Sequence, residues 1–472
     1  MKKSLLLFVV ILLVTVVQTM GQTWPKFRNS DNLNGYTADP GPYTDDVLWE
    51  YWENTFSVVS SPAVVNGKVY FGSLDSLVYC LDAMTGSVLW TYRTTGPIYY
   101  SSPAIAHGKL YIGSWDGILY CLDAEAGSLV WNFNTGMLNG FNSCPSVVDG
   151  KVYFGSNNSR VYCLDAETGT EVWSYLTGMS VWCSPAVVDG RVYIGSFDNK
   201  MYCLDAATGD SIWATSCPMI IYSSPAVVDG KLYFGTIVGG VAYCLDINDG
   251  SVIWQRALYG AIFASPAVMD GRVFFGVDQV SQGYKGSLYC LDAATGDSIW
   301  CNAHYNNGTI YSSPVVNDSL IFYGSCNFSL YCARQSTGEL IWESENYSKV
   351  LASPAVVEDR IYYSTDDGRV VCLSGSVGTD KHQLTASSLK IYPNPSVGIV
   401  KVGFTVNEPS TVAIKLYNAS GEKVLDISAG EYPAGEHTIN LNADNKTALS
   451  PGVYLCSVTT NQTTRVEKVI VY

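Results

Sequence analysis

The sequence has few charged residues, and basic residues are the scarcer kind. Only 15% of the 472 residues are charged, and 27 Lys and Arg stand against 42 Asp and Glu, which gives a net charge of −15. Nucleic-acid binding needs clusters of Lys and Arg that neutralise phosphates, and attraction to an anionic membrane surface needs the same. We therefore predict no nucleic-acid partner and no association with an anionic membrane surface.

Histidine is also scarce, which removes many familiar catalytic and metal-binding arrangements. Only four histidines occur, no pair of them has zinc-site spacing, and no Gly-x-Ser-x-Gly motif is present. Serines that recur in Ser-Ser-Pro motifs are interpreted as hydrogen-bonding groups at strand starts. Recurrent aspartates, which could suggest calcium, have the positions of turn formers: Asp82, Asp123, Asp165, Asp205, Asp246 and Asp292. We predict no catalytic residue and no metal site.

Long apolar runs are absent after the first 21 residues. Residues 1–21 begin with Lys2 and Lys3, continue with an apolar run from Leu5 to Val17, and end with small residues at the −3 and −1 positions. This pattern is typical of a secretory signal peptide, because the run is too short to span a membrane easily. No cysteine follows it to carry a lipid anchor. We expect a secreted chain without a transmembrane anchor, in which 22–45 is an N-terminal extension.

The dominant pattern of the sequence is a repeat marked by tryptophan. Eight tryptophans recur at intervals of 40 to 46 residues: Trp49, Trp90, Trp131, Trp173, Trp213, Trp254, Trp300 and Trp342. Each repeat contains short apolar strand patterns separated by tight turns such as Asn66-Gly67. Such a period, made only of strands and turns, is typical of a β-propeller with four-stranded blades. The tryptophans are predicted to dock neighbouring blades.

The two ends of the repeat region predict how many blades there are. Eight Ser-Pro or Cys-Pro pairs begin repeats, but the eighth repeat stops at Leu373 without a fourth strand or a tryptophan. Val47-Leu48-Trp49 supplies the missing pattern at the other end. We predict an all-β, eight-bladed propeller over 46–373 whose last blade is completed by an N-terminal strand. Such closure removes exposed sheet edges.

Fourteen cysteines would suggest disulfides in a secreted chain, but eight of them share one repeat position. They recur in the third strand of each blade, too far apart to be bridged, and are predicted to be small core residues. These eight are Cys80, Cys121, Cys163, Cys203, Cys244, Cys290, Cys332 and Cys372. Cys144 and Cys183 replace serines near the axis of adjacent blades, so a disulfide between them remains open.

The repeat resembles a known superfamily. The motif Tyr-Cys-Leu-Asp-Ala-x-Thr-Gly-x-x-x-Trp, as in Tyr162 to Trp173, resembles the tryptophan-docking repeat of pyrroloquinoline quinone (PQQ)-like propellers, which include quinoprotein dehydrogenases and the assembly factor BamB. The resemblance covers 46–373 and implies the fold, whereas activities on this scaffold differ. Many of the dehydrogenases use PQQ, calcium and a disulfide between adjacent cysteines. No Cys-Cys pair occurs here and the blades are short, so we predict no cofactor.

A second module follows the propeller. A polar linker over 374–388 leads into 389–472, where seven short strand patterns predict a small β-sandwich. This tail resembles the C-terminal sorting domain of the Bacteroidetes type IX secretion system, through Tyr392-Pro-Asn-Pro395, Pro451-Gly-Val-Tyr454 and the terminal Lys468 to Tyr472. The resemblance implies that the type IX machinery is a partner and that the protein is secreted or placed on the outer cell surface. An ordinary carbohydrate-binding or immunoglobulin-like domain is the alternative.

Function is sought where the repeat varies. The residue before each Ser-Ser-Pro-type motif enters the innermost strand, and the hairpins between second and third strands should open on the same face. Aromatic residues at these places are candidates for ligand binding: Tyr100, Trp115, Trp182, Phe197, Tyr222, Phe263, Tyr284, Tyr311 and Phe328. Packing of these rings between blades is the alternative interpretation.

We favour a monomeric, non-enzymatic binding scaffold for a protein or glycan. The alternatives are an extracellular PQQ-type oxidoreductase and a BamB-like assembly factor, although the missing lipid-anchor cysteine and the sorting tail disfavour the latter.

Overall fold

The chain divides into two compact units, Met1–Val377 and Gly378–Tyr472. The computed structural model describes residues 23–52, 56–137, 140–279, 285–303, 308–375, 390–392, 401–406, 410–418, 423–433, 435–440, 452–459 and 464–471. The predicted signal peptide and most of the predicted linker lie outside these residues. The described residues form β-strands and no helix, so none of them forms an apolar helix long enough to cross a membrane.

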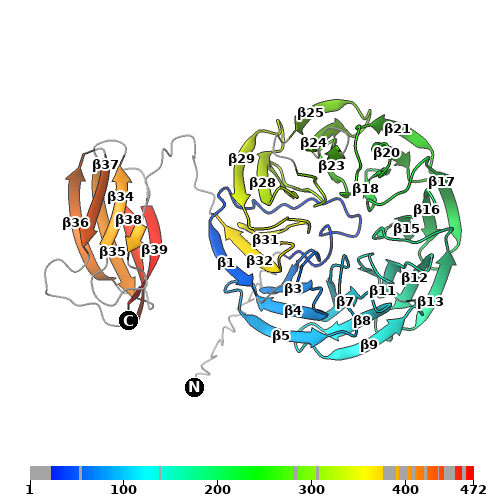
Figure 1. Ribbon diagram of the computed structural model, residues 1–472, viewed down its shortest axis with the longest axis horizontal. Helices are drawn as coiled ribbons and strands as arrows, with labels where there is room; N and C mark the ends of the chain where they lie inside the picture. Colours follow the sequence, from blue (N-terminus) through cyan, green and yellow to red (C-terminus); the bar gives the residue numbers. More distant parts are fainter. Residues whose placement is uncertain are drawn as a thin grey trace, which may run out of the picture. The chain divides into compact units, whose positions relative to one another are not determined.

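The first unit is a ring of eight four-stranded antiparallel sheets, each of them one blade (Figure 1). The innermost strands lie beside one another around the axis: they are β2 (Ala63–Val65), β6 (Ala104–Ala106), β10 (Ser146–Val148), β14 (Ala186–Val188), β18 (Ala226–Val228), β22 (Ala267–Met269), β26 (Val315–Val316) and β30 (Ala355–Val357). The second strands are β3 (Lys68–Gly72), β7 (Lys109–Gly113), β11 (Lys151–Gly155), β15 (Arg191–Gly195), β19 (Lys231–Gly235), β23 (Arg272–Gln279), β27 (Leu320–Gly324) and β31 (Arg360–Ser364).

The outer half of each blade consists of its third and fourth strands. The third strands are β4 (Leu77–Asp82), β8 (Ile118–Asp123), β12 (Arg160–Asp165), β16 (Lys200–Asp205), β20 (Val241–Asp246), β24 (Lys285–Asp292), β28 (Ser329–Arg334) and β32 (Arg369–Ser374). The fourth strands are β5 (Val88–Arg93), β9 (Leu129–Asn134), β13 (Glu171–Leu176), β17 (Ser211–Ser216), β21 (Val252–Ala257), β25 (Ser298–Ala303), β29 (Leu340–Glu345) and, for the eighth blade, β1 (Val47–Trp52).

The N-terminal strand closes the ring, as predicted. Strand β1 pairs antiparallel with β32 and places Trp49 opposite Cys372. The eighth sheet has the order β1-β32-β31-β30, so strands from both ends of the propeller sequence form one blade. The predicted all-β, eight-bladed architecture is thereby confirmed.

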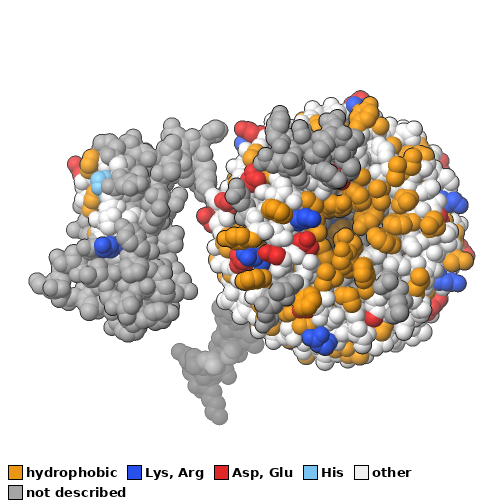
Figure 2. Space-filling model, viewed as in Figure 1, with side chains coloured by type: hydrophobic (Ala, Val, Ile, Leu, Met, Phe, Trp, Pro, Cys, Tyr) orange, Lys and Arg blue, Asp and Glu red, His pale blue; other side chains and the backbone are white. Residues whose placement is uncertain are grey.

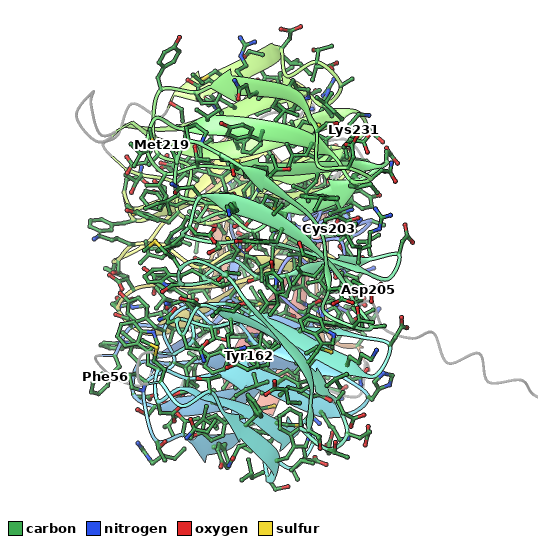
Figure 3. All side chains as sticks on the ribbon, turned by 90° about the vertical axis from the view of Figure 1, so that its right-hand side faces the viewer. Phe56, Tyr162, Cys203, Asp205, Met219 and Lys231 are labelled. Atoms are coloured by element: carbon green, nitrogen blue, oxygen red, sulfur yellow. The ribbon has the colours of Figure 1, made fainter. Side chains whose placement is uncertain are left out.

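Turn chemistry sets the strand boundaries at one end of the ring, where the two turns of a blade are neighbours. Asn66 and Gly67 have φ of 51° and 72°, as the tight hairpin between β2 and β3 requires. The Asp165 carboxylate accepts the N–H groups of Glu167 and Thr168 at 3.1 and 2.8 Å, and these bonds lower its pKa. The repeated aspartates therefore act as turn formers. Figure 3 shows Asp205 and Lys231 at one end of the ring, and Phe56 and Met219 at the other.

The repeated tryptophans join each blade to the next. The Trp173 indole N–H donates to the Ala206 carbonyl oxygen at 3.1 Å, and the ring packs on Gly209. A Cβ on Gly209 would lie 2.6 Å from this indole, and its φ of +78° also favours glycine. Equivalent bonds run from five other tryptophans: Trp49, Trp90, Trp131, Trp213 and Trp254. Trp342 instead donates to the carbonyl oxygen of Pro42, which precedes β1, at 3.2 Å. Trp300 keeps the ring packing, but its N–H has no partner among the described residues.

The repeated cysteines belong to the same blade interfaces. All eight are buried and free, and each lies opposite the tryptophan of its own blade, as Cys163 lies opposite Trp173. Cys144 and Cys183 are also free. The Cys144 sulfur accepts the Ser102 N–H of the preceding blade at 3.2 Å, whereas the Cys183 sulfur lies 3.4 Å from the Tyr222 carbonyl oxygen of the following blade. The two sulfurs point to opposite neighbours, so the disulfide that the sequence left open is not formed.

Residues 23–46, which we call the N-terminal segment, begin at the axis of the ring and then run outward to β1 (Figure 1). Their carbonyl oxygens accept hydrogen bonds of 2.7–3.0 Å from the middle N–H groups of six innermost strands, those of Val64, Ile105, Val187, Val227, Val268 and Val316. A backbone N–H that faces the axis without a partner would be costly, so this pairing stabilises both the segment and the ring. The sequence predicted an extension here but not its place.

The second unit consists of two antiparallel sheets. One has the order β33-β34-β37 and the other β36-β35-β38-β39. The strands are β33 (Lys390–Tyr392), β34 (Lys401–Val406), β35 (Ser410–Asn418), β36 (Lys423–Tyr432), β37 (Gly435–Asn440), β38 (Gly452–Thr459) and β39 (Thr464–Val471). Val402 of the first sheet packs with Ile414 and Val458 of the second, which makes a small β-sandwich as predicted. Much of the motif on which the predicted sorting function depends, including Pro393 to Gly398, lies outside the described residues.

Candidate functional site

A cavity of about 240 Å³ opens at one axial end of the propeller. It is lined by the residue that precedes the Ser-Ser-Pro-type motif of every blade. We call these the rim residues: Val59, Tyr100, Asn142, Trp182, Tyr222, Phe263, Tyr311 and Leu351. Figure 2 shows hydrophobic side chains gathered around a hollow at the centre of the ring. The repeat geometry therefore brings eight positions, about 40 residues apart in sequence, to one mouth.

Aromatic rim residues form a continuous row along one side of the cavity. Trp182 meets Tyr222 with ring centroids 5.6 Å apart, Tyr222 meets Phe263 at 5.3 Å, and Phe263 meets Tyr311 at 4.5 Å. Phe197, from the hairpin between β15 and β16, supports Trp182 from behind at 4.8 Å. These rings are partly exposed. Such a row offers flat apolar faces to a ligand.

The opposite side carries a smaller aromatic group. Tyr99 contacts Tyr100 edge-on at 4.3 Å and stacks on Trp115 at 4.6 Å. The Trp115 N–H donates to the Asn142 side-chain oxygen at 3.1 Å. Burial raises the pKa of both Tyr100 and Tyr222, and the two hydroxyl groups interact across the cavity. At neutral pH both phenols are uncharged and can donate hydrogen bonds.

Below the rim lies a closed ring of hydrogen bonds, which we call the floor ring. Its members are Ser61, Ser102, Cys144, Ser184, Ser224, Ser265, Ser313 and Ser353, and all of them line the cavity. Each backbone N–H donates to the side-chain oxygen or sulfur of the next blade at 2.8–3.2 Å, and Ser353 closes the circle on Ser61. The repeated serines thus link blades at the axis, which the sequence did not reveal.

The N-terminal segment completes the floor. Phe27 lines the cavity, and the neighbouring Arg28 is only 1% exposed. The Arg28 guanidinium donates to the carbonyl oxygens of Pro266, at 2.6 Å, and Pro314. Its Nε has no partner among the described residues, and burial lowers the pKa of Arg28 to about 9. A cation therefore stays buried under the cavity at neutral pH. Gly35 makes room for it, since a Cβ there would lie 2.0 Å from the guanidinium.

The nine predicted ligand-binding residues have four different outcomes. Five line the cavity: Tyr100, Trp182, Tyr222, Phe263 and Tyr311. Trp115 and Phe197 lie behind them in contact with aromatic neighbours, and Phe328 is 46% exposed outside the lining. Tyr284 lies outside the described residues. The prediction missed Phe27, Cys326 and Lys349, which also line the cavity. Cys326 occupies the same hairpin position as Trp115 and Phe197 but is not aromatic, whereas Phe27 and Lys349 had no repeat signal to mark them.

The cavity does not fit the calcium ion that the superfamily resemblance implies. Its described lining contains no Asp or Glu, although calcium is held mainly by carboxylate and carbonyl oxygens. The described part of the chain also holds no group of three or more His, Cys, Asp and Glu side chains arranged for a metal. We therefore derive no reaction step through a calcium–quinone pair.

Sequence comparison identifies the family. The family described as "Outer membrane protein assembly factor BamB" matches residues 39–175, 116–275, 220–300 and 284–464. The chain belongs to this family. The BamB-family match extends past Leu373, where the sequence pattern of the blades stops. A comparison with curated proteins finds no match.

Solved structures with the same fold include both branches of the superfamily. BamB from Moraxella catarrhalis is 21% identical with a TM-score of 0.59, and the match covers 72% of this chain and 99% of that one. A europium-containing methanol dehydrogenase is 14% identical with a TM-score of 0.65, covering 75% and 98%. Quinohemoprotein alcohol dehydrogenase from Comamonas testosteroni is 17% identical with a TM-score of 0.65, covering 79% and 83%. At these identities the likeness shows the fold alone.

Proposed function

We propose that this protein is a non-enzymatic binding scaffold whose axial cavity holds a protein or glycan ligand outside the cell. One observation carries the proposal. The floor ring repeats nearly the same residue in every blade, whereas the rim residues above it differ from blade to blade. A repeated scaffold thus presents an asymmetric mouth, and the asymmetry has no role in closing the ring.

The chemistry of the mouth supports binding over catalysis. Aromatic faces and neutral hydroxyl groups dominate it, and Cys144, Cys326 and Lys349 are the remaining reactive groups of the described lining. Burial raises the pKa of the Cys144 and Cys326 thiols, which opposes thiolate formation. The contacts among the described lining residues include no nucleophile–base pair, while stacking and hydrogen-bonding groups are plentiful.

The test is a ligand screen with the mature full-length chain. Glycan-array binding and pull-down from cell-surface extracts should yield a ligand that is lost in Trp182→Ala and Tyr222→Ala. Trp52→Ala is the matched control, because Trp52 is 57% exposed and does not line the cavity. Binding that survives both cavity variants would place the ligand elsewhere and refute the proposal.

Family membership supports a second candidate, a BamB-like assembly factor. Here the same mouth would hold a segment of an outer-membrane assembly partner. Cross-linking from a photoreactive residue at Phe263, followed by mass spectrometry, separates the candidates, since only an assembly factor captures outer-membrane assembly proteins.

PQQ-type oxidation is tested on the same preparation, where added quinone and calcium should yield neither a bound chromophore nor dye reduction.

We further propose export in two steps, with residues 1–21 directing passage through the inner membrane and 389–472 engaging the type IX machinery. The tail resemblance and the separate C-terminal unit support this assignment. Deletion of 389–472 should leave the propeller in the periplasm. Intact mass of the native secreted protein should show that the tail has been removed, and a mature form that retains Tyr472 would contradict the assignment.

A further inference from the structure

The residues that line the cavity include one cation and no anion, although the chain as a whole is acidic. Burial raises the pKa of Cys326, and the carboxylates of Asp278 and Asp366, which lie outside this lining, raise it further. The chain carries a net charge of −15, yet the described lining contains no Asp or Glu, and Lys349 is its one charged residue. Lys349 is exposed at the mouth. An acidic ligand that enters the cavity therefore contacts a cation and no lining carboxylate, whereas most of the acidic surface would repel it.

A second cation lies directly under the floor. Arg28 has no carboxylate partner among the described residues, and its guanidinium bonds to the carbonyl oxygens of Pro266 and Pro314. These prolines follow Ser265 and Ser313 of the floor ring, so the charge lies within one residue of the cavity lining. A buried cation that is neutralised only by carbonyl dipoles leaves a positive potential above it.

The floor ring adds hydrogen-bond donors. Because each serine oxygen already accepts a backbone N–H, as Ser224 accepts that of Ser184 at 2.8 Å, its own hydroxyl proton is left for another acceptor. An anionic group held above these hydroxyls would accept several charge-assisted bonds. The tyrosine hydroxyls of the rim can add to them.

Six of the eight innermost strands have their middle N–H group already paired, which disfavours strand addition by an extended peptide. N–H groups of the floor ring bond to side chains of the next blade, and the middle N–H groups of six innermost strands bond to the N-terminal segment. Strand addition, which gives extended peptides most of their affinity, therefore finds few partner groups among the described residues. Recognition must come from aromatic faces, hydroxyl groups and the two cations.

Resting on the proposed function, we infer that the ligand is an acidic saccharide whose carboxylate is held over the floor ring between Lys349 and Arg28. The sugar ring stacks on the row that includes Trp182 and Tyr222. A peptide with a free C-terminal carboxylate is the competing ligand class and is an outcome of the test.

The probe is a pair of oligosaccharides that differ only in charge, oligogalacturonate and its methyl ester, with binding to the full-length chain measured by calorimetry. The acid should bind at least tenfold tighter at low salt, and added salt should weaken the acid but not the ester. Lys349→Gln should weaken the acid about fivefold and leave the ester unchanged. Lys231→Gln, at the opposite end of the ring (Figure 3), removes the same charge and should change neither.

Two substitutions separate the charge of Arg28 from its size. Arg28→Met should reduce the preference for the acid, whereas Arg28→Lys should retain it. If Arg28→Met fails to fold, the salt dependence and the Lys349→Gln variant still show whether the ligand is held by its negative charge. Equal binding of acid and ester that is lost in Trp182→Ala would overturn the acidic-saccharide inference and leave the proposed function standing. Binding only of peptides with a free carboxylate would overturn the saccharide class. No cavity-dependent ligand at all would defeat the proposed function itself.

Discussion

Closure of the ring by β1 makes a specific prediction for Trp49→Ala. The Trp49 indole is 8% exposed, packs on Gly86 and donates to the Ala83 carbonyl oxygen at 3.0 Å. Removing a buried tryptophan costs about 3–5 kcal/mol, and the lost hydrogen bond, about 1 kcal/mol, is part of that sum. Because Trp49 belongs to the one blade built from two distant parts of the chain, the loss should also free β1 from β32.

Two measurements separate these effects. Urea unfolding should show Trp49→Ala and Trp173→Ala to be destabilised to a similar extent, since both indoles are 8% exposed and make the same type of bond. Hydrogen exchange should differ, with faster exchange of β1 and β32 amides in Trp49→Ala only. Trp52→Ala, on the same strand but 57% exposed, should cost less than about 1 kcal/mol. If Trp49→Ala unfolds like Trp52→Ala, β1 does not secure the ring.

Three further predictions test the interfaces. Gly86→Ala should destabilise more than Gly67→Ala by about 2 kcal/mol in urea unfolding, because both have φ near +70° but only Gly86 lies against a tryptophan. If Gly86→Ala and Gly67→Ala lose the same stability, the contact between Gly86 and Trp49 does not matter for stability. Cys144→Ser should raise stability by about 0.5–1 kcal/mol, since oxygen accepts the floor-ring N–H better than sulfur does, whereas Ser224→Ala should lower it by about 1–3 kcal/mol. Burial raises the pKa of Asp278 from 3.8 to about 6, so wild-type stability should fall as pH rises from 4 to 6 and stay low above it. Asp278→Asn should remove that slope in thermal melts from pH 4 to pH 8, and an unchanged slope would assign it to another group.

The repeat made the fold predictable because every strand and turn is specified several times. The N-G and D-G turns, the docking tryptophans and the unfinished eighth repeat each predict the same ring, and the pairing of β1 with β32 confirms it. The rim was predictable in part for the same reason, since register places a residue such as Tyr222 at the mouth once the blade is known.

Much of what the sequence did not predict lies outside the repeat. Residues 23–46 carry no period, so nothing in them showed that their carbonyl oxygens would match N–H groups spaced about 40 residues apart. The burial of Arg28 was also not predicted, because a lone arginine in a polar extension is normally solvated. Lys349 and Cys326 enter the cavity from connections whose repeat equivalents differ.

The N-terminal part of the chain therefore has two roles that are physically coupled. Residues 47–52 complete the eighth blade, and the preceding residues 24–35 form hydrogen bonds around the axis and carry Phe27 and Arg28 to the cavity floor. A ligand that contacts this floor binds the closed ring and not a ring from which β1 has detached. Binding must then stabilise closure by the same free energy that closure adds to binding. A cavity ligand should accordingly slow hydrogen exchange in β1 and β32, which lie in the outer half of the eighth blade, and this slowing should vanish in Arg28→Met if the floor is the coupling element.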